Sequence, residues 1–312
     1  MLPTSTPGRS TSQDRAINPT LIIFLVVSIW FYLNIFLLVW FRPLPWYLAG
    51  AIFCVQVVLI FAMFTPLHDG VHRVASRTRW LNDLILWGTW PVFLNSPIFF
   101  KRLHITHHAY TNHPEMDPDH FTASEKLSAR WTRSFLLIFY YYWYGFKHYG
   151  TGGFWNALTM ISSTVGPSII IGLGLFTEFS QACLLGWILP NLVGIGLLAF
   201  ANTSWPHHPA QDTSRIGNTR NLYVPRWLQF IMFNQNLHLV HHLKPTIPWY
   251  EYEEYWRLNE KKFVQQGAKV ASFTDRSDPY SLLPATVREG SAARPARLAD
   301  LLRYYRDLAF RR

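Results

Sequence analysis

Residues 21–41 read LIIFLVVSIWFYLNIFLLVWF and include no charged side chain. At 1.5 Å per residue, a helix of this length crosses the roughly 30 Å hydrocarbon core of a membrane. Three further uncharged runs of similar length follow, at residues 44–65, 156–176 and 181–201. Residues 42–43 join the first run to the second, and residues 177–180 join the third run to the fourth. The sequence therefore predicts an all-α integral membrane protein with four transmembrane helices in two hairpins.

The overall composition agrees with a membrane protein. Hydrophobic residues make up 50% of the chain and charged residues only 15%, against about 25% charged in soluble domains. The only two cysteines are Cys54 and Cys183, too few for a disulfide framework or a thiolate metal site. The net charge of +10 comes from scattered basic residues rather than a nucleic-acid-binding motif. It suits anionic lipid headgroups or an acidic protein partner.

Composition also divides the chain into segments. We expect a disordered N-terminal tail over residues 1–18, a membrane domain over 19–265 and a cytoplasmic C-terminal tail over 266–312. The last includes an amphipathic helix that begins near Arg297. Residues 80–100 are apolar but interrupted by polar residues, which favours an interfacial element. Residues 134–145 are too short to span and favour a helix at the membrane surface.

The distribution of basic residues predicts the orientation. Residues 66–155 include nine lysines and arginines, whereas the two hairpin turns include only Arg42. The positive-inside rule then places both termini and the central loop in the cytoplasm. We expect a helical cap on that face, in a bacterial inner membrane.

Eight of the thirteen histidines are gathered in three short motifs. Box one is HDGVH (residues 68–72), box two is HITHH (residues 104–108) and box three is HLVHH (residues 238–242). Positions i, i+3 and i+4 share one face of a helix, so each box can direct its imidazoles at one point. The other histidines, among them His113, His120 and His148, lack this spacing and are expected to have ordinary surface or interface roles.

The number and type of these ligands narrow the choice of metal. Eight imidazoles exceed what one four-coordinate zinc needs, and no H-E-x-x-H motif is present. Divided over two ions, they leave each ion an open position, which suits O₂ activation at a pair of irons. Imidazole also binds copper, so copper remains an alternative on ligand type alone.

The three boxes, in this order and beside two hairpins, resemble the membrane fatty acid desaturase superfamily. The flanking sequences DPDHF (residues 117–121), Pro206-His207 and NLHLVHHLKPTIPWY (residues 236–250) are similar to its bacterial branch, which includes β-carotene ring hydroxylases. The resemblance covers about residues 18–265. His208 departs from that branch, in which carotenoid enzymes typically have arginine at this position.

The resemblance implies two iron ions, O₂ as co-substrate and nine histidine ligands. The ligands would be His68, His72, His104, His107, His108, His207, His238, His241 and His242. We expect His207, rather than His208, to be the ninth ligand, because Pro206 and Pro209 predict a rigid turn that directs one ring inward. Metal-bound imidazoles usually donate their second N–H to a carboxylate or amide. Four residues are candidates for that role: Asp69, Asp117, Asp119 and Asn236.

The chain has neither a G-x-G-x-x-G nor a haem-binding H-P-G-G motif. Electrons must therefore come from a separate ferredoxin- or cytochrome-like donor. For the substrate we favour a lipid, most of all a fatty acyl chain, with an acyl carrier protein as a further potential partner. Its reaction would be desaturation or oxidative decarboxylation to a terminal alkene. Two alternatives stay open: a carotenoid ring hydroxylase or ketolase, and a membrane metal-binding or transport protein without enzymatic activity.

Overall fold

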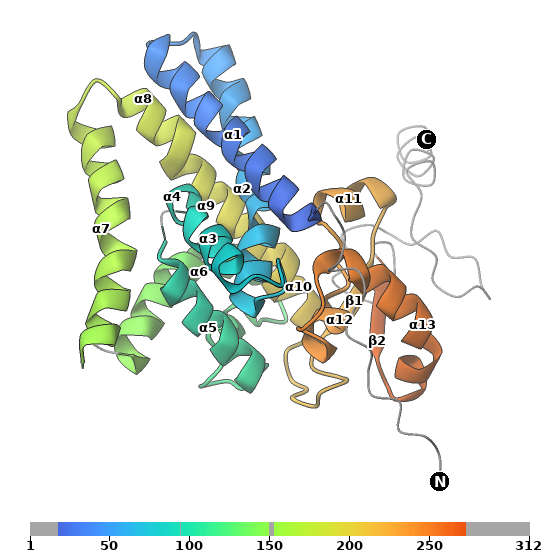
Figure 1. Ribbon diagram of the computed structural model, residues 1–312. Helices are drawn as coiled ribbons and strands as arrows, with labels where there is room; N and C mark the ends of the chain where they lie inside the picture. The colour runs from blue at the N-terminus through green and yellow to red at the C-terminus, as the bar shows by residue number, and fades with distance from the viewer. Residues whose placement is uncertain (1–17, 94, 150–152, 273–312) are drawn as a thin grey trace, which may run out of the picture.

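The computed structural model describes residues 18–93, 95–149 and 153–272 (Figure 1). The predicted tail over residues 1–17 and the predicted helix near Arg297 lie outside the described residues. In the described part, four helical segments are long and apolar enough to cross a membrane. They are residues 19–40, 46–72, 154–176 and 180–207. The protein is thus mostly helical, as the sequence predicts for an integral membrane protein.

The first two spans lie side by side (Figure 1). Helix α1 (Pro19–Trp40) begins at Asn18, whose side chain accepts a hydrogen bond from the amide of Leu21. Helix α2 (Trp46–His72) packs along α1. It continues seven residues past Thr65, where the predicted span ends. The membrane helix itself therefore positions both histidines of box one.

The last two spans are α7 (Phe154–Phe176), which contacts α8 across a short turn, and a composite helix over residues 180–207. The composite helix alternates between α-helical and π-helical segments. They are α8 (Ser180–Cys183), η3 (Leu184–Ile188), α9 (Leu189–Leu198), η4 (Ala199–Ser204) and α10 (Trp205–His207). It ends six residues beyond residue 201, the predicted end of this span, and so reaches His207.

A buried polar contact connects three of the spans. The Gln56 side chain of α2 accepts a hydrogen bond from Asn34 of α1 (3.2 Å) and donates one to the carbonyl of Gly186 (2.9 Å). Gly186 lies in the π-helical segment η3, and a Cβ atom there would lie 2.3 Å from Ile35 Cδ1. Glycine therefore permits the close approach, and Gln56 supplies a partner for a backbone carbonyl inside the membrane.

Shorter helices connect the two halves of the membrane domain. Residues 79–110 form α3 (Arg79–Gly88), α4 (Trp90–Phe93) and α5 (Pro97–Tyr110), and α5 contains box two. A 3-10 turn η2 (Pro118–Thr122) leads to α6 (Leu127–His148). Helix α6 contains the predicted surface segment and exposes Phe139 and Trp143 while it buries Leu137 and Tyr144. Its apolar exposed face fits a membrane surface.

The C-terminal elements gather near the first turn of α1 (Figure 1). They are α11 (Arg226–Ile231), α12 (His238–Leu243) with box three, η5 (Trp249–Glu251) and α13 (Tyr252–Gln265). One contact joins the two ends of the domain: Trp249 Nε1 donates to Thr20 Oγ1 (3.2 Å). Box three is thereby fixed against the helix that begins the membrane domain.

A small parallel sheet departs from the purely helical prediction. Strand β1 (Arg220–Tyr223) pairs with β2 (Lys269–Ser272), with Arg220 opposite Lys269. Strand β2 lies beyond residue 265, so the ordered structure continues past the predicted domain boundary. The Asn221 side chain of β1 accepts a hydrogen bond from the amide of Leu239 (3.0 Å). The sheet therefore holds the first turn of box three.

Candidate metal centre

Four helices bring histidines to one place. Box one lies at the end of α2, box two on the last two turns of α5, His207 at the end of α10 and box three on α12. In each box the histidines are spaced three or four residues apart, so they share a face of their helix. Their rings form two adjacent groups, which we call centre A and centre B.

Centre A consists of five histidines from boxes one, two and three: His68, His72, His104, His108 and His241. The ligand atoms of the four other than His108 all lie within 4.8 Å of one another, whereas His108 forms such a group with His241 and with His242 of centre B. Four Nε2–Nε2 distances connect the five histidines. The distance is 3.0 Å between His68 and His241, 2.8 Å between His72 and His104, 3.1 Å between His104 and His108, and 2.7 Å between His108 and His241. All five thus present the same ring nitrogen to one another.

Centre B consists of four histidines: His107, His207, His238 and His242. The Nε2–Nε2 distance is 3.0 Å between His207 and His238, 3.2 Å between His238 and His242, and 3.3 Å between His107 and His242. The four ligand atoms all lie within 4.8 Å of one another. His107 and His108 are adjacent in sequence and serve different centres.

These distances match shared coordination. Two imidazole nitrogens bound at about 2.1 Å to one ion, at right angles, lie about 3 Å apart. Mutual hydrogen bonding is a poor alternative, because each neutral imidazole has one donor and one acceptor and cannot pair with two neighbours through a single Nε2. Each centre therefore suits one metal ion bound through Nε2.

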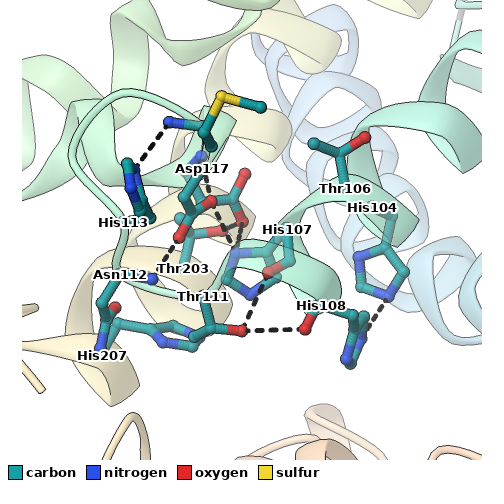
Figure 2. A network of polar contacts seen from close by, with 12 residues as sticks. His104, Thr106, His107, His108, Thr111, Asn112, His113, Asp117, Thr203 and His207 are labelled. Carbon is teal, nitrogen blue, oxygen red and sulfur yellow. Dashed lines mark hydrogen bonds and ion pairs between the residues drawn. The ribbon is translucent and has the colours of Figure 1, made fainter. Parts of the chain in front are cut away.

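The second ring nitrogen of several histidines has a defined partner. His107 Nδ1 donates to Asp117 Oδ1 (2.9 Å), His207 Nδ1 to the carbonyl of Asn218 (3.1 Å) and His241 Nδ1 to the hydroxyl of Tyr252 (3.2 Å). Figure 2 shows the His107 ring next to Asp117, with His104 and His108 on the same helix as His107. Such contacts fix the tautomer that leaves Nε2 free for a metal.

Burial determines the charge of these rings. Burial, reinforced by the neighbouring imidazoles, lowers the pKa of five histidines of α5 and α12, namely His104, His108, His238, His241 and His242. His107 differs. Burial lowers its pKa, but the carboxylates of Asp117 and Asp119 outweigh burial and raise it to about 9. The centres therefore combine neutral imidazole lone pairs with two carboxylates that hold a proton on His107, and a metal cation bound there would displace that proton.

Two of the four predicted partners of the histidines lie next to His107. Asp117 also accepts hydrogen bonds from the backbone amides of Asn112 (2.7 Å) and Asp119 (2.8 Å), which hold its carboxylate in place. Asp119 Oδ2 lies 3.6 Å from His107 Nδ1 and accepts a hydrogen bond from Thr203 (3.2 Å). These two acidic residues therefore support centre B.

The other two predicted partners are placed differently. Asp69 lies beside His68, but its Oδ1 is 3.8 Å from His68 Nδ1, too far for a hydrogen bond, and its Oδ2 accepts one from Thr20 (2.8 Å). The Nδ2 group of Asn236 donates to the carbonyl of Leu222 (2.8 Å). Its backbone carbonyl accepts from the amide of Leu222 as well, so Asn236 fixes β1 and not a histidine.

His207 and His208 diverge at a turn over His208 and Pro209, in which the amide of Ala210 donates to the carbonyl of His207. His207 is the last residue of a helix that includes Pro206, and His208 is extended, with φ −60° and ψ 135°. The wide π-helical turn η4 makes room for the ring of Pro206, which in a regular α-helix would clash with the carbonyl four residues earlier. His207 joins centre B, whereas His208 is buried next to a small polar cavity with Arg130 and Asp119.

Three other histidines lie outside both centres within the described chain. His113 Nδ1 accepts hydrogen bonds from the amides of Glu115 and Met116 (both 3.3 Å), and His148 stacks on Tyr144 with 4.1 Å between ring centroids. His120 lines the small polar cavity. They have the ordinary structural roles that their lack of spacing predicts.

Some contacting residues give no signal in the sequence. Tyr252 and Asn218 hold His241 and His207, yet Tyr252 is one of 15 tyrosines and Asn218 acts through its backbone carbonyl. Tyr141 donates a hydrogen bond to Asp119 from α6, 22 residues away. Only the folded chain brings these groups to the centres.

An apolar cavity lies one side chain away from each of the two centres. Phe64 and Phe100 line it, and their rings pack against His68 and His104 with 5.5 Å between centroids in each pair. Tyr141 and Thr203 line another part of its wall, and both donate to Asp119 beside centre B. The lining is that of a site for an apolar molecule close to the metal.

The sequence matches a family model described as "Fatty acid desaturase" over residues 43–274. The match therefore includes all nine histidines of the two centres and the helices that line the cavity.

Three relatives are similar at low identity. The sn-1 oleoyl-lipid 12-desaturase of Synechocystis sp. is 24% identical over 241 residues, 66% of this chain and 67% of the relative. The zeaxanthin 4-ketolase of Chlamydomonas reinhardtii is 24% identical over 286 residues, 85% of this chain and 56% of the relative. The sn-1 acyl-lipid omega-3 desaturase (ferredoxin) of Nostoc sp. is 24% identical over 255 residues, 80% of this chain and 62% of the relative. This chain thus spans from just over half to two thirds of the length of these relatives.

Proposed function

Because this chain belongs to the fatty acid desaturase family and is an oxidoreductase, we propose that it oxidises unactivated C–H bonds of a lipid acyl chain. The reaction uses O₂, two iron ions and electrons from a separate protein. One observation supports this proposal above all: residues that line an apolar cavity, Phe64 and Phe100, pack directly against His68 and His104 of the histidine centres.

Centre A would hold one iron through five imidazoles and centre B the other through four. The donor atoms fit this assignment, since they are imidazole nitrogens, and the Nδ1 atoms of His107, His207 and His241 have acceptors. Bound iron supplies the activation of O₂. The carboxylate pair Asp117 and Asp119 orients His107 and balances part of the metal charge.

The cavity would hold the substrate. Its walls include Leu67, Phe93, Leu137, Ile195 and Leu198, which exclude water and bind methylene groups by burial. Desaturation removes two hydrogens from adjacent carbons, and O₂ is reduced to two water molecules by two electrons from the substrate and two from the donor. The cavity positions the substrate: it would hold one part of the acyl chain next to Phe64 and Phe100, whose rings contact centre A.

For the topology we propose two hairpins with both termini and the metal-binding cap in the cytoplasm. The packing of α1 on α2 and of α7 on α8 supports the hairpins. The nine lysines and arginines in residues 66–155, against Arg42 in the hairpin turns, support the orientation. The membrane would be a bacterial inner membrane.

The electron donor would approach from the cap. His72, His108 and His242 are only half-buried, in contrast to His68 and His241, so the edge of the centres lies nearest to solvent there. An acidic ferredoxin- or cytochrome-like protein suits the basic chain, and one relative has ferredoxin in its name. The names of the relatives mention acyl lipids and no carrier protein. We therefore omit an acyl carrier protein from the proposal.

Oxidation of a carotenoid ring is the second candidate. The ketolase relative is aligned with 85% of this chain, more than either desaturase above.

One experiment tests both candidates. The protein is produced in membranes with ferredoxin, its reductase and O₂, and the extracted lipids and pigments are analysed by mass spectrometry. An acyl product two hydrogens lighter supports desaturation, whereas an oxygenated carotenoid supports the alternative. The matched controls are anaerobic incubation and His107→Ala. The absence of any O₂-dependent product, with iron bound, contradicts both.

A further inference from the structure

Asn202 is a polar side chain in the wall of the apolar cavity. It lies on the π-helical segment η4, and only 6% of its surface is exposed. Within the described chain, neither Oδ1 nor Nδ2 of its carboxamide has a hydrogen-bond partner. Buried amides are nearly always paired, because an orphaned donor or acceptor loses its hydration without compensation. The side chain is therefore built for a partner that enters the cavity.

The position of Asn202 places that partner next to the metal centre. The following residue, Thr203, donates to Asp119 Oδ2, which lies 3.6 Å from His107 Nδ1 of centre B. Five residues after Asn202 the same helix ends at His207, a member of centre B. A group bound to Asn202 would thus lie on the side of the cavity that is connected to centre B.

Other polar residues of the cavity wall are already satisfied. The hydroxyls of Tyr141 and Thr203 donate to Asp119, and the hydroxyl of Thr89 donates to the carbonyl of Leu86 (2.7 Å). Asn95 Oδ1 also lacks a partner in the described structure. However, Asn95 is only half-buried. It lies before the first residue of α5, whereas His104 lies two turns into that helix. Asn202 is therefore the amide that distinguishes substrates at the reacting end.

We propose that Asn202 binds a hydroxyl group of the substrate, close to the C–H bond that is oxidised. A hydroxyl has one donor and two acceptor sites, so a single hydroxyl can pair both Oδ1 and Nδ2. A carbonyl or ester oxygen pairs only Nδ2, and a methylene pairs neither. A site that pairs a substrate hydroxyl rejects the analogue without it, since its own polar groups are then left unpaired. The inference rests on the proposed function and narrows its substrate class to hydroxylated lipids.

The test compares ligands that differ only in hydroxyl groups. Two pairs serve as probes: β-carotene with its ring-hydroxylated derivative zeaxanthin, and stearoyl with 12-hydroxystearoyl phosphatidylcholine. Each pair is mixed at equal amounts with iron-loaded, affinity-captured protein in detergent. Mass spectrometry measures the retained ratio, corrected for partition into empty micelles. We expect the wild type to prefer the hydroxylated member of at least one pair by tenfold or more.

Variants assign that preference to the amide. Asn202→Leu, which keeps the size but removes both polar atoms, should abolish the preference, and Asn202→Ser should restore part of it. Thr89→Val, which removes a satisfied hydroxyl from the same cavity, should keep it. Iron content and circular dichroism are measured for each variant, so that an unfolded protein is recognised. Asn202→Ser provides a second test if Asn202→Leu does not fold.

Three outcomes overturn the inference. The first is that the wild type retains both members of each ligand pair equally. The second is that Asn202→Leu keeps the preference for the hydroxylated ligand. The third is that Asn202→Leu loses iron but keeps that preference. The last would assign the amide to the metal centre. Failure of the proposed function has a different signature: hydroxyl preference persists, but no lipid or pigment yields an O₂-dependent product.

Discussion

The Nε2 atoms of His68 and His241 lie 3.0 Å apart, although 173 residues separate the two histidines along the chain. Box one is part of a membrane helix and box three is part of a six-residue helix in the C-terminal region. Centre A forms only when these two parts and α5 meet, and centre B likewise needs α5, α10 and α12. A metal ion in either centre would therefore join segments from the whole membrane domain.

The first prediction concerns metal content. The purified protein should hold close to two irons per chain, and His207→Ala should hold close to one, because the substitution removes one of the four imidazoles of centre B. Elemental analysis of the detergent-purified protein measures both. His208→Ala is the matched control and should keep two irons. If His208→Ala loses iron while His207→Ala keeps it, the assignment of the ninth ligand is reversed.

The second prediction concerns Asp117. Asp117→Asn should weaken iron binding at centre B by about 10–100-fold, the usual effect of losing a carboxylate that orients a ligating histidine. The carboxylate accepts from His107 Nδ1 and from two backbone amides. Iron retention during titration with a chelator measures the change. Asp212→Asn, which changes a carboxylate paired with Lys269 away from the centres, is the control. Equal iron retention in the two variants would contradict this role.

The third prediction concerns the sides of the membrane. In a chain with Cys54→Ser and Cys183→Ser, a cysteine introduced at Ser124 should react with an impermeant thiol reagent only from the cytoplasmic side. A cysteine introduced at Thr177 should react only from the opposite side. The uneven distribution of lysine and arginine is the reason. Labelling of both positions from one side would be incompatible with two hairpins.

The fourth prediction concerns the cavity. Ala199 is buried in its wall, so Ala199→Phe should fill part of the space and lower kcat/KM for the lipid substrate by tenfold or more. Iron content should stay unchanged. Leu192→Phe, at a partly exposed position on the same span, should have little effect on either. Product analysis with lipids of several chain lengths measures the change, and full activity of Ala199→Phe on every lipid would place the substrate elsewhere.

The fifth prediction concerns stability inside the membrane. Gln56→Leu should lower the free energy of unfolding by about 0.6–1.7 kcal/mol, the range measured for hydrogen bonds between membrane helices. The substitution removes the partners of Asn34 and of the Gly186 carbonyl. Reversible unfolding in mixed micelles measures the difference. Val55→Leu, at an exposed neighbouring position, is the control. No difference between the variants would show that this contact does not stabilise the helix packing.

The sequence predicts the elements with strong local patterns. Long uncharged runs define the spans, and the spacing of three and four residues places the imidazoles of each box on one face. Neither pattern divides the histidines between two centres, because that division depends on how α2, α5, α10 and α12 meet in space. His107 and His108 illustrate the point, since adjacent positions on α5 serve different centres.

Asn236 has a structural role that the sequence does not predict. Its place two residues before box three suggests a partner for a histidine, but its side chain and backbone both bond to Leu222 of β1. That strand pairs with residues 269–272, nearly fifty residues further along the chain. Strands as short as four residues leave little pattern in a sequence, and parallel pairing depends on distant contacts. Asn236 therefore serves a sheet that local reasoning does not predict.

The π-helical segment η4 sets the direction in which the last span ends. It adds one residue to a helical turn between the membrane part of the span and His207. Each residue of an α-helix turns the direction of the next side chain by about 100°. Removal of one residue from 199–204 would therefore leave most of the span unchanged, yet turn His207 away from His238. The length of this one turn thus determines whether centre B has its fourth imidazole, independently of the membrane helices themselves.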